Sequence, residues 1–385
     1  MRYNFGLLAL ALGTFSIGVT EFAPMGLLPV IATDIGVSIP RAGLLVSAYA
    51  LGVVLGAPLM TLAADKVARR TFLIALIGIF TFGNVLAAVS GSYTALLVAR
   101  IVTSLSQGAF FGVGAVVATG LVPANRRAGA VSMMFMGLSL SNVAGVPFAT
   151  WAGGYLGWRS SFWGIAGLGV ITMAALRLTL PALPVAVGSN ALKELRALTS
   201  GPVLRALALT VIAASAMFTV FTYIVPILHG ATHASPGFVT AMLVNYGLGL
   251  TAGNWLGGKL ADRSVDLTLL TGFATVIAAL IAFSFLMPYS LPTAVIIFIW
   301  GTASFILVPP LQIQVITAAA DAPSLASSVN IGAFNLGNAA GAALGGAVIA
   351  ANLGNPAIML AGAAMSTLGL AFFARTRTMT PKAPV

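Results

Sequence analysis

The sequence predicts an all-α membrane protein in which twelve transmembrane helices form two six-helix bundles. The composition is the first observation behind this prediction. Hydrophobic residues make up 59% of the 385-residue chain and Asp, Glu, Lys and Arg only 6%, whereas a soluble domain carries about 25% charged residues. The mean hydropathy is +1.06. The second and third observations are a succession of long apolar segments and an internal duplication.

The apolar segments each hold about 20 residues or more, which is enough to cross about 30 Å of hydrocarbon. The loops between them are too short to hold a soluble domain of useful size. We expect spans at 5–31, 41–63, 71–89, 94–119, 128–154, 160–180, 204–228, 237–260, 267–287, 291–316, 324–351 and 355–374. Proline or glycine marks most of the joints, as at Pro40, Gly157 and Pro236.

The basic residues predict the orientation in the membrane. Of the 18 Lys and Arg residues, all but three fall on the side that holds both termini. Arg41 and Arg159 lie on the other side, and Arg100 lies within the fourth span. Because cytoplasmic loops are enriched in Lys and Arg, we expect both termini in the cytoplasm. The net charge of +11 therefore reflects topology and does not predict binding of nucleic acid.

The two halves of the chain repeat one another. A shift of 197 residues lays Tyr49 on Tyr246, and a shift of 196 aligns the fifth span with the eleventh. A repeat of six spans preserves sidedness, so the halves are expected to be parallel repeats about an axis along the membrane normal. We predict an N-terminal bundle at 1–180, a cytoplasmic linker at 181–203 and a C-terminal bundle at 204–385.

Several protein classes fit this sequence poorly. The chain has no cysteine, so it has no disulfide, thiolate nucleophile or cysteine metal site. His229 and His233 are spaced as zinc ligands can be, but no third ligand is evident, so we expect no metal. No Ser/His/Asp set or pair of carboxylates falls at one depth, which argues against a membrane enzyme. A channel would need a ring of charges or a filter-like loop, and neither half contains one.

Glu21 is the only acidic residue inside an apolar segment. A charge at membrane depth is costly, so such a residue usually faces a cavity and has a function. Burial favours the protonated form of a carboxyl group, which suits a proton carrier. Arg100 is the only basic residue at this depth, and we expect both residues to take part in proton coupling. The alternatives are a structural glutamic acid and an arginine that only binds neighbouring carbonyl groups.

Short motifs in both halves resemble those of one transporter family. Residues 61–70 read TLAADKVARR and residues 258–263 read GKLADR, and both resemble motif A of the major facilitator superfamily. Residues 98–108, VARIVTSLSQG, are similar to its motif B, and residues 142–147, NVAGVP, to its antiporter motif C. The TEF at 20–22 resembles the bacterial efflux branch of its twelve-span drug:proton antiporters, whose members export arabinose, purines and chloramphenicol. The resemblance covers essentially the whole chain.

The resemblance implies roles for the motif residues. Motif A implies a gate at the cytoplasmic helix ends, formed by Asp65, Arg69, Arg70, Asp262 and Arg263. The N-terminal copy departs from motif A at Thr61, where glycine is usual, and the C-terminal copy has Ser264-Val265-Asp266 in place of the Arg pair. We expect Asp65 to be the main gate residue and Asp262 the second. Ordinary interfacial charges are the alternative. Motif C implies a hinge at Gly145 and Pro147, where proline should bend the fifth span.

Aromatic, methionine and amide side chains within the spans are candidates for a substrate-binding site. An unpaired amide in hydrocarbon is costly, so amides at this depth are expected to face a cavity. The candidates are Phe22, Met25, Gln107, Phe110, Asn142, Met217, Tyr223, Asn245, Tyr246, Trp300, Asn330 and Phe334. Most Phe and Met residues in membrane helices instead face lipid or the protein core, and this is the alternative for each of them.

Glycines recur four residues apart in spans of both halves, for example at Gly249, Gly253 and Gly257. Such stripes let helices approach closely. Because the stripes occur at matching positions in the two repeats, we expect them to form the seam along which the halves rock against each other.

These observations together predict a proton-coupled secondary transporter that exports small amphipathic compounds or drugs by alternating access. The alternative is a sugar or nucleoside exporter on the same scaffold, which would need more hydrogen-bonding side chains in its cavity. We expect a monomeric, multi-pass protein of the bacterial inner membrane. Its partners would be a small-molecule substrate, protons and the lipid bilayer, and no cofactor is expected besides protons as the coupling ion.

Overall fold

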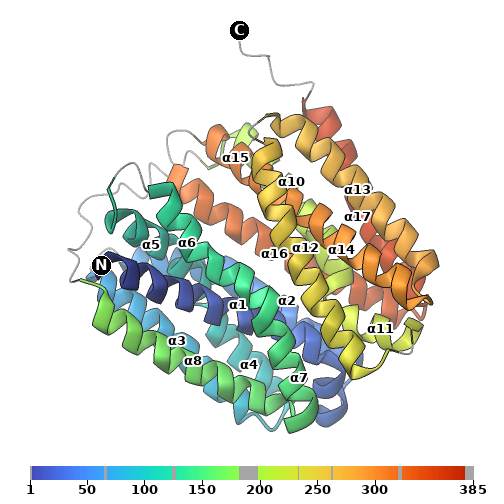
Figure 1. The fold of residues 1–385 in the computed structure, drawn as a ribbon, viewed down its shortest axis with the longest axis horizontal. Coiled ribbons are helices and arrows are strands. Elements are labelled where there is room, and N and C mark those ends of the chain that lie inside the picture. The colour runs from blue at the N-terminus through green and yellow to red at the C-terminus, as the bar shows by residue number, and fades with distance from the viewer. Residues whose placement is uncertain are drawn as a thin grey trace.

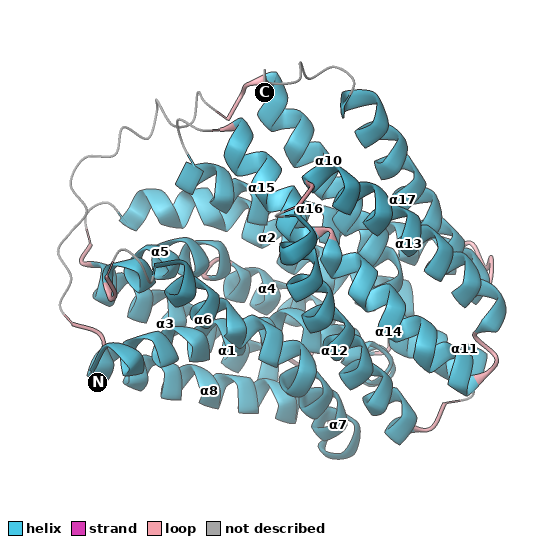
Figure 2. Ribbon diagram, turned by 45° about the horizontal axis from the view of Figure 1, so that its top comes forward, coloured by secondary structure: helices cyan, strands magenta, loops and turns pink. Residues whose placement is uncertain are grey.

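The computed structural model describes residues 2–64, 67–123, 127–181, 198–232, 234–261, 263–319 and 323–377. Every regular element in these ranges is helical, and they contain no strand (Figure 2). The predicted all-α class is therefore confirmed.

The helices follow the twelve predicted spans to within a few residues. Eight spans are single helices: α1 (Arg2–Ile35), α2 (Ile39–Ala64), α3 (Arg69–Ala88), α8 (Trp158–Thr179), α12 (Pro236–Ala261), α13 (Val265–Leu286), α16 (Pro323–Ala350) and α17 (Asn355–Arg377). Four spans are broken: α4 (Tyr93–Ser104) with α5 (Gln107–Gly120); α6 (Arg127–Leu140), the π-helix η2 (Ser141–Gly145) and α7 (Val146–Leu156); α10 (Gly201–Phe221) with α11 (Ile224–Thr232); and α14 (Ser290–Ile306) with α15 (Val308–Ala318). Within the described residues, eleven of these spans are long and apolar enough to cross a membrane, whereas α12 has the length, 26 residues, but is less apolar.

The helices from α1 to α8 pack against one another, and so do those from α10 to α17 (Figure 1). The first group runs from blue to green at the lower left of Figure 1, and the second from yellow to red at the upper right. Contacts between the groups join α2 to α16, α1 to α11, and α12 to η2 and α7. Residues 182–197, most of the predicted linker, lie outside the described residues, so the bundle boundaries stay predictions. The helix α10 begins at Gly201, inside the range assigned to the linker.

The breaks within spans fall where backbone hydrogen bonding is perturbed. Pro309 and Pro310 open α15, and neither has the N–H group that would continue the preceding helix. Between α4 and α5, the hydroxyl of Ser106 donates to the carbonyl oxygen of Thr103 (2.8 Å), a type of bond that bends helices. Pro226 lies in the first turn of α11 and likewise prevents a continuous helix from α10. The sequence-based spans did not include these interruptions.

Pro147 follows a widened turn of the fifth span. Residues Ser141–Gly145 form the π-helix η2, and Pro147 is the second residue of α7. Proline cannot donate to the carbonyl group of Val143, and a π turn is a common way to accommodate such a lost bond. The span is therefore irregular where proline was expected to distort it. The hinge role of Gly145 and Pro147 stays a prediction.

The glycine stripes lie within each half, so the prediction that they form the seam between the halves is wrong. A Cβ atom on Gly249, Gly253 or Gly257 of α12 would strike backbone atoms of α14. One on Gly341 of α16 would strike the backbone of α10, and one on Gly145 would strike side chains of α1. Repetition of the stripes in both halves reflects a packing geometry that was duplicated, because close helix contact needs small residues inside each bundle.

The contact between the halves includes Tyr223, in the break between α10 and α11. Its hydroxyl donates to the carbonyl oxygen of Ala342 on α16 (2.8 Å). The same side chain lies against Gly43 of α2. Ser47 of α2 also donates to the carbonyl oxygen of Ala339 on α16 (3.1 Å). These contacts hold α2 and α16 together toward the end that is predicted to face outward.

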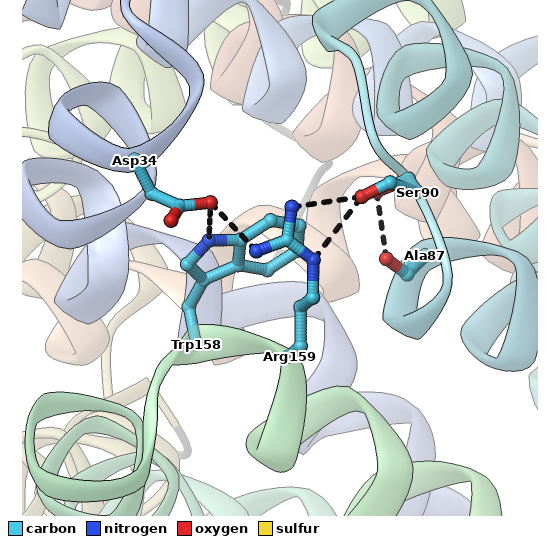
Figure 3. Close-up of polar contacts among 5 residues, drawn as sticks. All are labelled: Asp34, Ala87, Ser90, Trp158 and Arg159. Atoms are coloured by element: carbon cyan, nitrogen blue, oxygen red, sulfur yellow. Dashed lines mark hydrogen bonds and ion pairs between the residues drawn. The ribbon is translucent and has the colours of Figure 1, made fainter.

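A polar cluster joins three helices of the N-terminal half at the same end (Figure 3). Arg159, at the start of α8, donates to Asp34 Oδ2 of α1 (2.6 Å) and to the carbonyl oxygen of Ser90 after α3 (2.9 and 3.2 Å). Trp158 Nε1 donates to the same Asp34 oxygen (3.0 Å). The Arg159 guanidinium also lies over the Trp158 ring, 4.2 Å from its centroid. The cluster fastens α1, α3 and α8 to one another.

Candidate functional site

Glu21 is buried near the middle of α1 and is 3% exposed. Gln107, the first residue of α5, donates from Nε2 to Glu21 Oε2 (2.9 Å). The break after α4 places this amide at the start of a helix, and Gln107 is itself 1% exposed. The carboxyl group therefore sits in an apolar interior with an amide as its hydrogen-bond partner.

Arg100 of α4 belongs to the same cluster and is 1% exposed. Its Nη1 donates to the carbonyl oxygen of Thr20 (2.7 Å), the residue before Glu21. Its guanidinium carbon lies 4.1 Å from the centroid of the Tyr49 ring on α2. Arg100 and Glu21, both within the described residues, form no direct ion pair, but their charges interact at longer range. The structure thus brings together the acid and the base that the sequence singled out separately.

Thr20 and Asn84 position the carbonyl group that receives Arg100. Thr20 donates from Oγ1 to Asn84 Oδ1 (2.6 Å), and Asn84 Nδ2 donates to the carbonyl oxygen of Phe80 (2.8 Å). Both side chains are fully buried. Neither of these residues, nor Tyr49, is among the site residues predicted from the sequence. Asn84 is an amide within an apolar span, like the amides that were predicted to line the site. Tyr49 was noted only because it aligns with Tyr246 in the repeat.

Four polar atoms of this cluster have no hydrogen-bond partner among the described residues: Tyr49 OH, Gln107 Oε1, and Nε and Nη2 of Arg100. Buried polar atoms are almost always paired, because leaving them unpaired is costly. The cluster therefore has spare donors and acceptors around one acid and one base. Gain or loss of a proton at Glu21 would change the net charge of the cluster by one, in a region where little solvent screens the change.

A cluster of aromatic side chains begins beside Glu21 and extends into the C-terminal half. Phe22 stacks on Phe218, with ring centroids 6.2 Å apart. Phe221 stacks on Tyr246 (4.5 Å), and Tyr246 lies against Trp300 (4.7 Å). We call this the aromatic cluster, and it consists of Phe22, Phe218, Phe221, Tyr246, Trp300 and Phe334. Four of the predicted lining residues thus meet here.

Other predicted lining residues are placed in the core or between helices. Phe110 packs against Gly13 of α1, inside the N-terminal half. Met25 and Met217 are buried in the same hydrophobic core as the aromatic cluster. Tyr223 lies between α2 and α16, as described above.

Two of the remaining predicted amides bond to a neighbouring helix, and the third bonds within its own span. Asn245 Nδ2 donates to the carbonyl oxygen of Ala294 on α14 (2.7 Å). Asn330 Nδ2 donates to Gln312 Oε1 on α15 (2.5 Å). Asn142 Nδ2 donates to a carbonyl of its own helix (3.0 Å). These bonds satisfy the Nδ2 groups of the three amides, whereas Asn330 Oδ1 is buried without a hydrogen-bond partner among the described residues.

The predicted gate is only partly within the described residues. Asp65 and Asp262 lie outside them. Arg70 Nη1 donates to the backbone carbonyl that follows α8 (3.1 Å), a favourable position for a cation. Arg69 is half-buried and Arg263 exposed. Within the described part of the chain, no three His, Asp or Glu side chains gather as metal ligands would.

Residues 10–330 match the sequence profile of the Major Facilitator Superfamily. The chain belongs to this superfamily. It is 54% identical over 370 residues to the inner membrane transport protein YdhP of Escherichia coli strain K12. The aligned region covers 96% of this chain and 95% of that protein. It is 32% identical over 356 residues to a chloramphenicol resistance protein of Streptomyces lividans, covering 91% and 90%.

Solved structures show the same fold. A bacterial homologue of the human lysosomal transporter Spinster, in an inward-facing and unoccupied conformation, has a TM-score of 0.78 at 17% identity, covering 100% of this chain and 99% of that one. A D-xylose-proton symporter has a TM-score of 0.79 at 15% identity, covering 96% and 97%. The superfamily membership confirms the predicted resemblance, and the protein is a membrane transporter rather than an enzyme.

Proposed function

We propose that this superfamily member exports small amphipathic compounds, drugs among them, in exchange for protons. The observation that carries the proposal is the buried cluster in which Glu21 accepts a hydrogen bond from Gln107 and lies near Arg100. An intramembrane acid with a nearby base is a common arrangement in proton-coupled transporters. The chloramphenicol resistance protein among the relatives supports outward transport.

Glu21 carries the proton in this proposal, and Arg100 responds to its charge. When Glu21 is ionised, it balances the positive charge of Arg100. When Glu21 is protonated, that charge is left to the carbonyl of Thr20 and the ring of Tyr49. Because the surroundings have a low dielectric, this difference favours different positions of α1 and α4 in the two states. The membrane potential adds about 2.3 kcal/mol per charge for each 100 mV.

The two halves, 1–180 and 204–385, reorient about their shared interface in this cycle. Gly145 and Pro147 would flex the fifth span, and the motif A charges would open and close the cytoplasmic end. The Lys and Arg distribution supports cytoplasmic termini, and the similarity to an inner membrane transport protein supports an inner-membrane location. The alternative of a sugar or nucleoside exporter is supported by buried amides of α16, since Asn330 Oδ1 and both amide atoms of Asn338 have no hydrogen-bond partner among the described residues. The chloramphenicol resistance protein among the relatives favours drug export.

Transport in proteoliposomes tests this proposal. Wild-type protein should move chloramphenicol when a pH gradient is applied and should not accumulate it without one. Glu21→Gln, which mimics the protonated state, should keep ligand binding but lose the gradient-driven component. Asp34→Asn is the matched control, because Asp34 is a carboxylate of the same helix that lies outside the cluster. Gradient-driven transport by Glu21→Gln at the wild-type rate would refute the role of Glu21.

A further inference from the structure

Asn338 of α16 is a buried amide with neither of its polar atoms paired. Its side chain is 1% exposed, and both Nδ2 and Oδ1 lack a hydrogen-bond partner among the described residues. Groups left unpaired in a protein interior are rare, because they lose their bonds to water and gain none in return. The amide therefore raises the free energy of the state that the structure shows.

Amides at comparable positions do find a partner. Asn142 is the repeat partner of Asn338 under the shift of 196 residues, and its Nδ2 donates to a carbonyl oxygen four residues earlier in the same span (3.0 Å). Asn335 of α16 bonds in the same way to the carbonyl oxygen four residues before it (3.0 Å). Asn338 has no such bond among the described residues.

The neighbours of Asn338 place it at the seam between the two halves. Residues four apart share a face of a helix, so Asn338 shares its face of α16 with Phe334 and Ala342. Phe334 packs on Phe218, with ring centroids 5.5 Å apart. Phe218 in turn stacks on Phe22 of the N-terminal half.

The bonds that join α2 to α16 lie directly beyond Asn338. Ser47 of α2 donates to the carbonyl oxygen of Ala339, the next residue (3.1 Å). Ala342 accepts the bond from Tyr223 (2.8 Å), whose side chain lies against α2. We call these two bonds the outer seal, because they lie toward the end that is predicted to face outward.

The unpaired amide and the outer seal have opposite effects on the closed state. Each bond of the seal stabilises it, and burial of an unpaired amide destabilises it by an amount of similar size. When α2 and α16 separate, the bonds are lost, but water reaches the amide and satisfies both of its atoms. Opening therefore requires less free energy than it would with an apolar residue at position 338.

We propose that Asn338 limits the stability of the outer seal, so that the closed state does not persist and the protein can open outward. This role rests on the reorientation of the two halves in the proposed function and names a residue that sets its equilibrium. An apolar side chain at this position would remove the unpaired groups and favour the closed state. A ligand can reach the amide only after the halves separate, because even water cannot reach it in the closed state.

Cysteine labelling from the outside measures this equilibrium. The chain has no native cysteine, so Val46→Cys supplies a single thiol on α2. Val46 is 1% exposed and belongs to a hydrophobic core formed mostly by α10 to α17, so the thiol becomes accessible only when the halves separate. A membrane-impermeant maleimide, added to intact cells, would give its labelling rate.

Two substitutions of Asn338 should change this rate in opposite directions. Leucine has the same number and branching of heavy atoms as asparagine but no polar group. Asn338→Leu should therefore slow labelling at least about tenfold, which corresponds to about 1.4 kcal/mol. Aspartate has the same shape, and its carboxyl group is costlier to bury than an amide when it is ionised. Asn338→Asp should therefore speed labelling.

Ser366→Ala is the matched control. Ser366 Oγ is also fully buried and has no hydrogen-bond partner among the described residues, but α17 packs on α10, α11, α13 and α16 of its own half. Removal of this hydroxyl should raise the melting temperature of the purified protein and leave the labelling rate unchanged. The control thus separates a general gain in stability from a shift between closed and open states.

The labelling rates decide the role of Asn338 without a substrate or a pH gradient. If Asn338→Leu is labelled as fast as the Val46→Cys background, or if Ser366→Ala slows labelling equally, the role is wrong. If Asn338→Leu does not fold, unchanged or slower labelling of Asn338→Asp overturns the role in its place. Gradient-driven transport in proteoliposomes would leave the proposed function standing in each of these cases. If the rates change as expected but no pH gradient drives transport, the role of Asn338 stands and the proton-coupled function fails.

Discussion

Phe22 of α1 and Phe218 of α10 are repeat partners that stack on each other, with centroids 6.2 Å apart and ring planes 12° apart. Two equivalent residues of a duplicated fold can touch only close to the axis that relates the halves. The rings therefore mark that axis. Glu21 precedes one of them, so the proposed protonation of Glu21 would take place next to the surface about which the halves would reorient.

The ring of Tyr49 is expected to stabilise the protein through Arg100. A cation over an aromatic face contributes about 2 kcal/mol when it is desolvated, and the two groups are 4.1 Å apart. Tyr49→Leu should lower thermal stability in detergent by roughly this amount. Tyr49→Phe keeps the ring and removes only a hydroxyl that has no partner among the described residues, so it should unfold near the wild-type temperature. Equal destabilisation by both changes would contradict the contact.

Thr20→Val is expected to destabilise the fold more than Thr20→Ser. Valine has a similar shape but leaves Asn84 Oδ1, now bonded at 2.6 Å, unpaired in the interior. Such a group costs about 1–3 kcal/mol. Serine keeps the hydroxyl and is the control. Thermal unfolding of the two purified variants would measure the difference, and similar melting temperatures would show that Asn84 does not depend on Thr20.

Gly341→Leu is expected to prevent close packing of α16 on α10. A Cβ atom at Gly341 would meet backbone atoms of α10. A Cβ atom at Gly332 on the same helix would meet no atom within 4 Å, so Gly332→Leu is the control. Backbone cannot rotate out of the way, so overpacking of about 1–3 kcal/mol or more is expected at Gly341 alone. Size-exclusion chromatography should show a reduced yield of monodisperse protein for Gly341→Leu and not for Gly332→Leu. Comparable yields of the two variants would contradict close packing of α16 on α10 at Gly341.

The outer cluster of Asp34 and Arg159 is expected to contribute little to stability. Their side chains are 45% and 38% exposed, and exposed pairs contribute about 0–1 kcal/mol. Arg159→Lys should lower the unfolding temperature slightly, because a lysine cannot bind both Asp34 and the Ser90 carbonyl as the planar guanidinium does. Transport should stay unchanged. A large loss of stability would mean that the cluster supports the whole bundle.

Much of the fold could be predicted from hydropathy, because a span needs a fixed length of apolar chain. The helix ends match the predicted spans closely, as with α3 at Arg69–Ala88 against 71–89. The breaks were missed, although Pro309, Pro310 and Pro226 were visible in the sequence. Hydropathy averages over a window and carries no information on single lost hydrogen bonds.

The site was harder to predict than the fold. Glu21 and Arg100 stood out because charges at membrane depth are rare. Asn84 and Thr20 act through hydrogen bonds between helices, and sequence spacing within one helix cannot reveal such pairs. The glycine stripes were recognised as packing surfaces, but their partners were assigned wrongly. A stripe shows that something lies close to it, and only the tertiary structure shows that this is a helix of the same half.

Gly43→Val is expected to shift the protein toward an outward-open state. A Cβ atom at Gly43 would strike the Tyr223 side chain, which cannot withdraw without losing its bond to Ala342 (2.8 Å). The substitution therefore pushes α2 away from this contact at the predicted outer end. Because the chain has no native cysteine, a single Ser47→Cys substitution can report the opening.

A membrane-impermeant maleimide, added from outside to intact cells, would measure the labelling rate of that cysteine. The rate should rise about tenfold with Gly43→Val, which corresponds to a shift of about 1.4 kcal/mol between the states. Gly154→Val is the control, since a Cβ there meets nothing within 4 Å. Equal rates in the two backgrounds would show that the Tyr223 contact does not close the protein. Labelling from the cytoplasmic side alone would show that the predicted orientation is reversed.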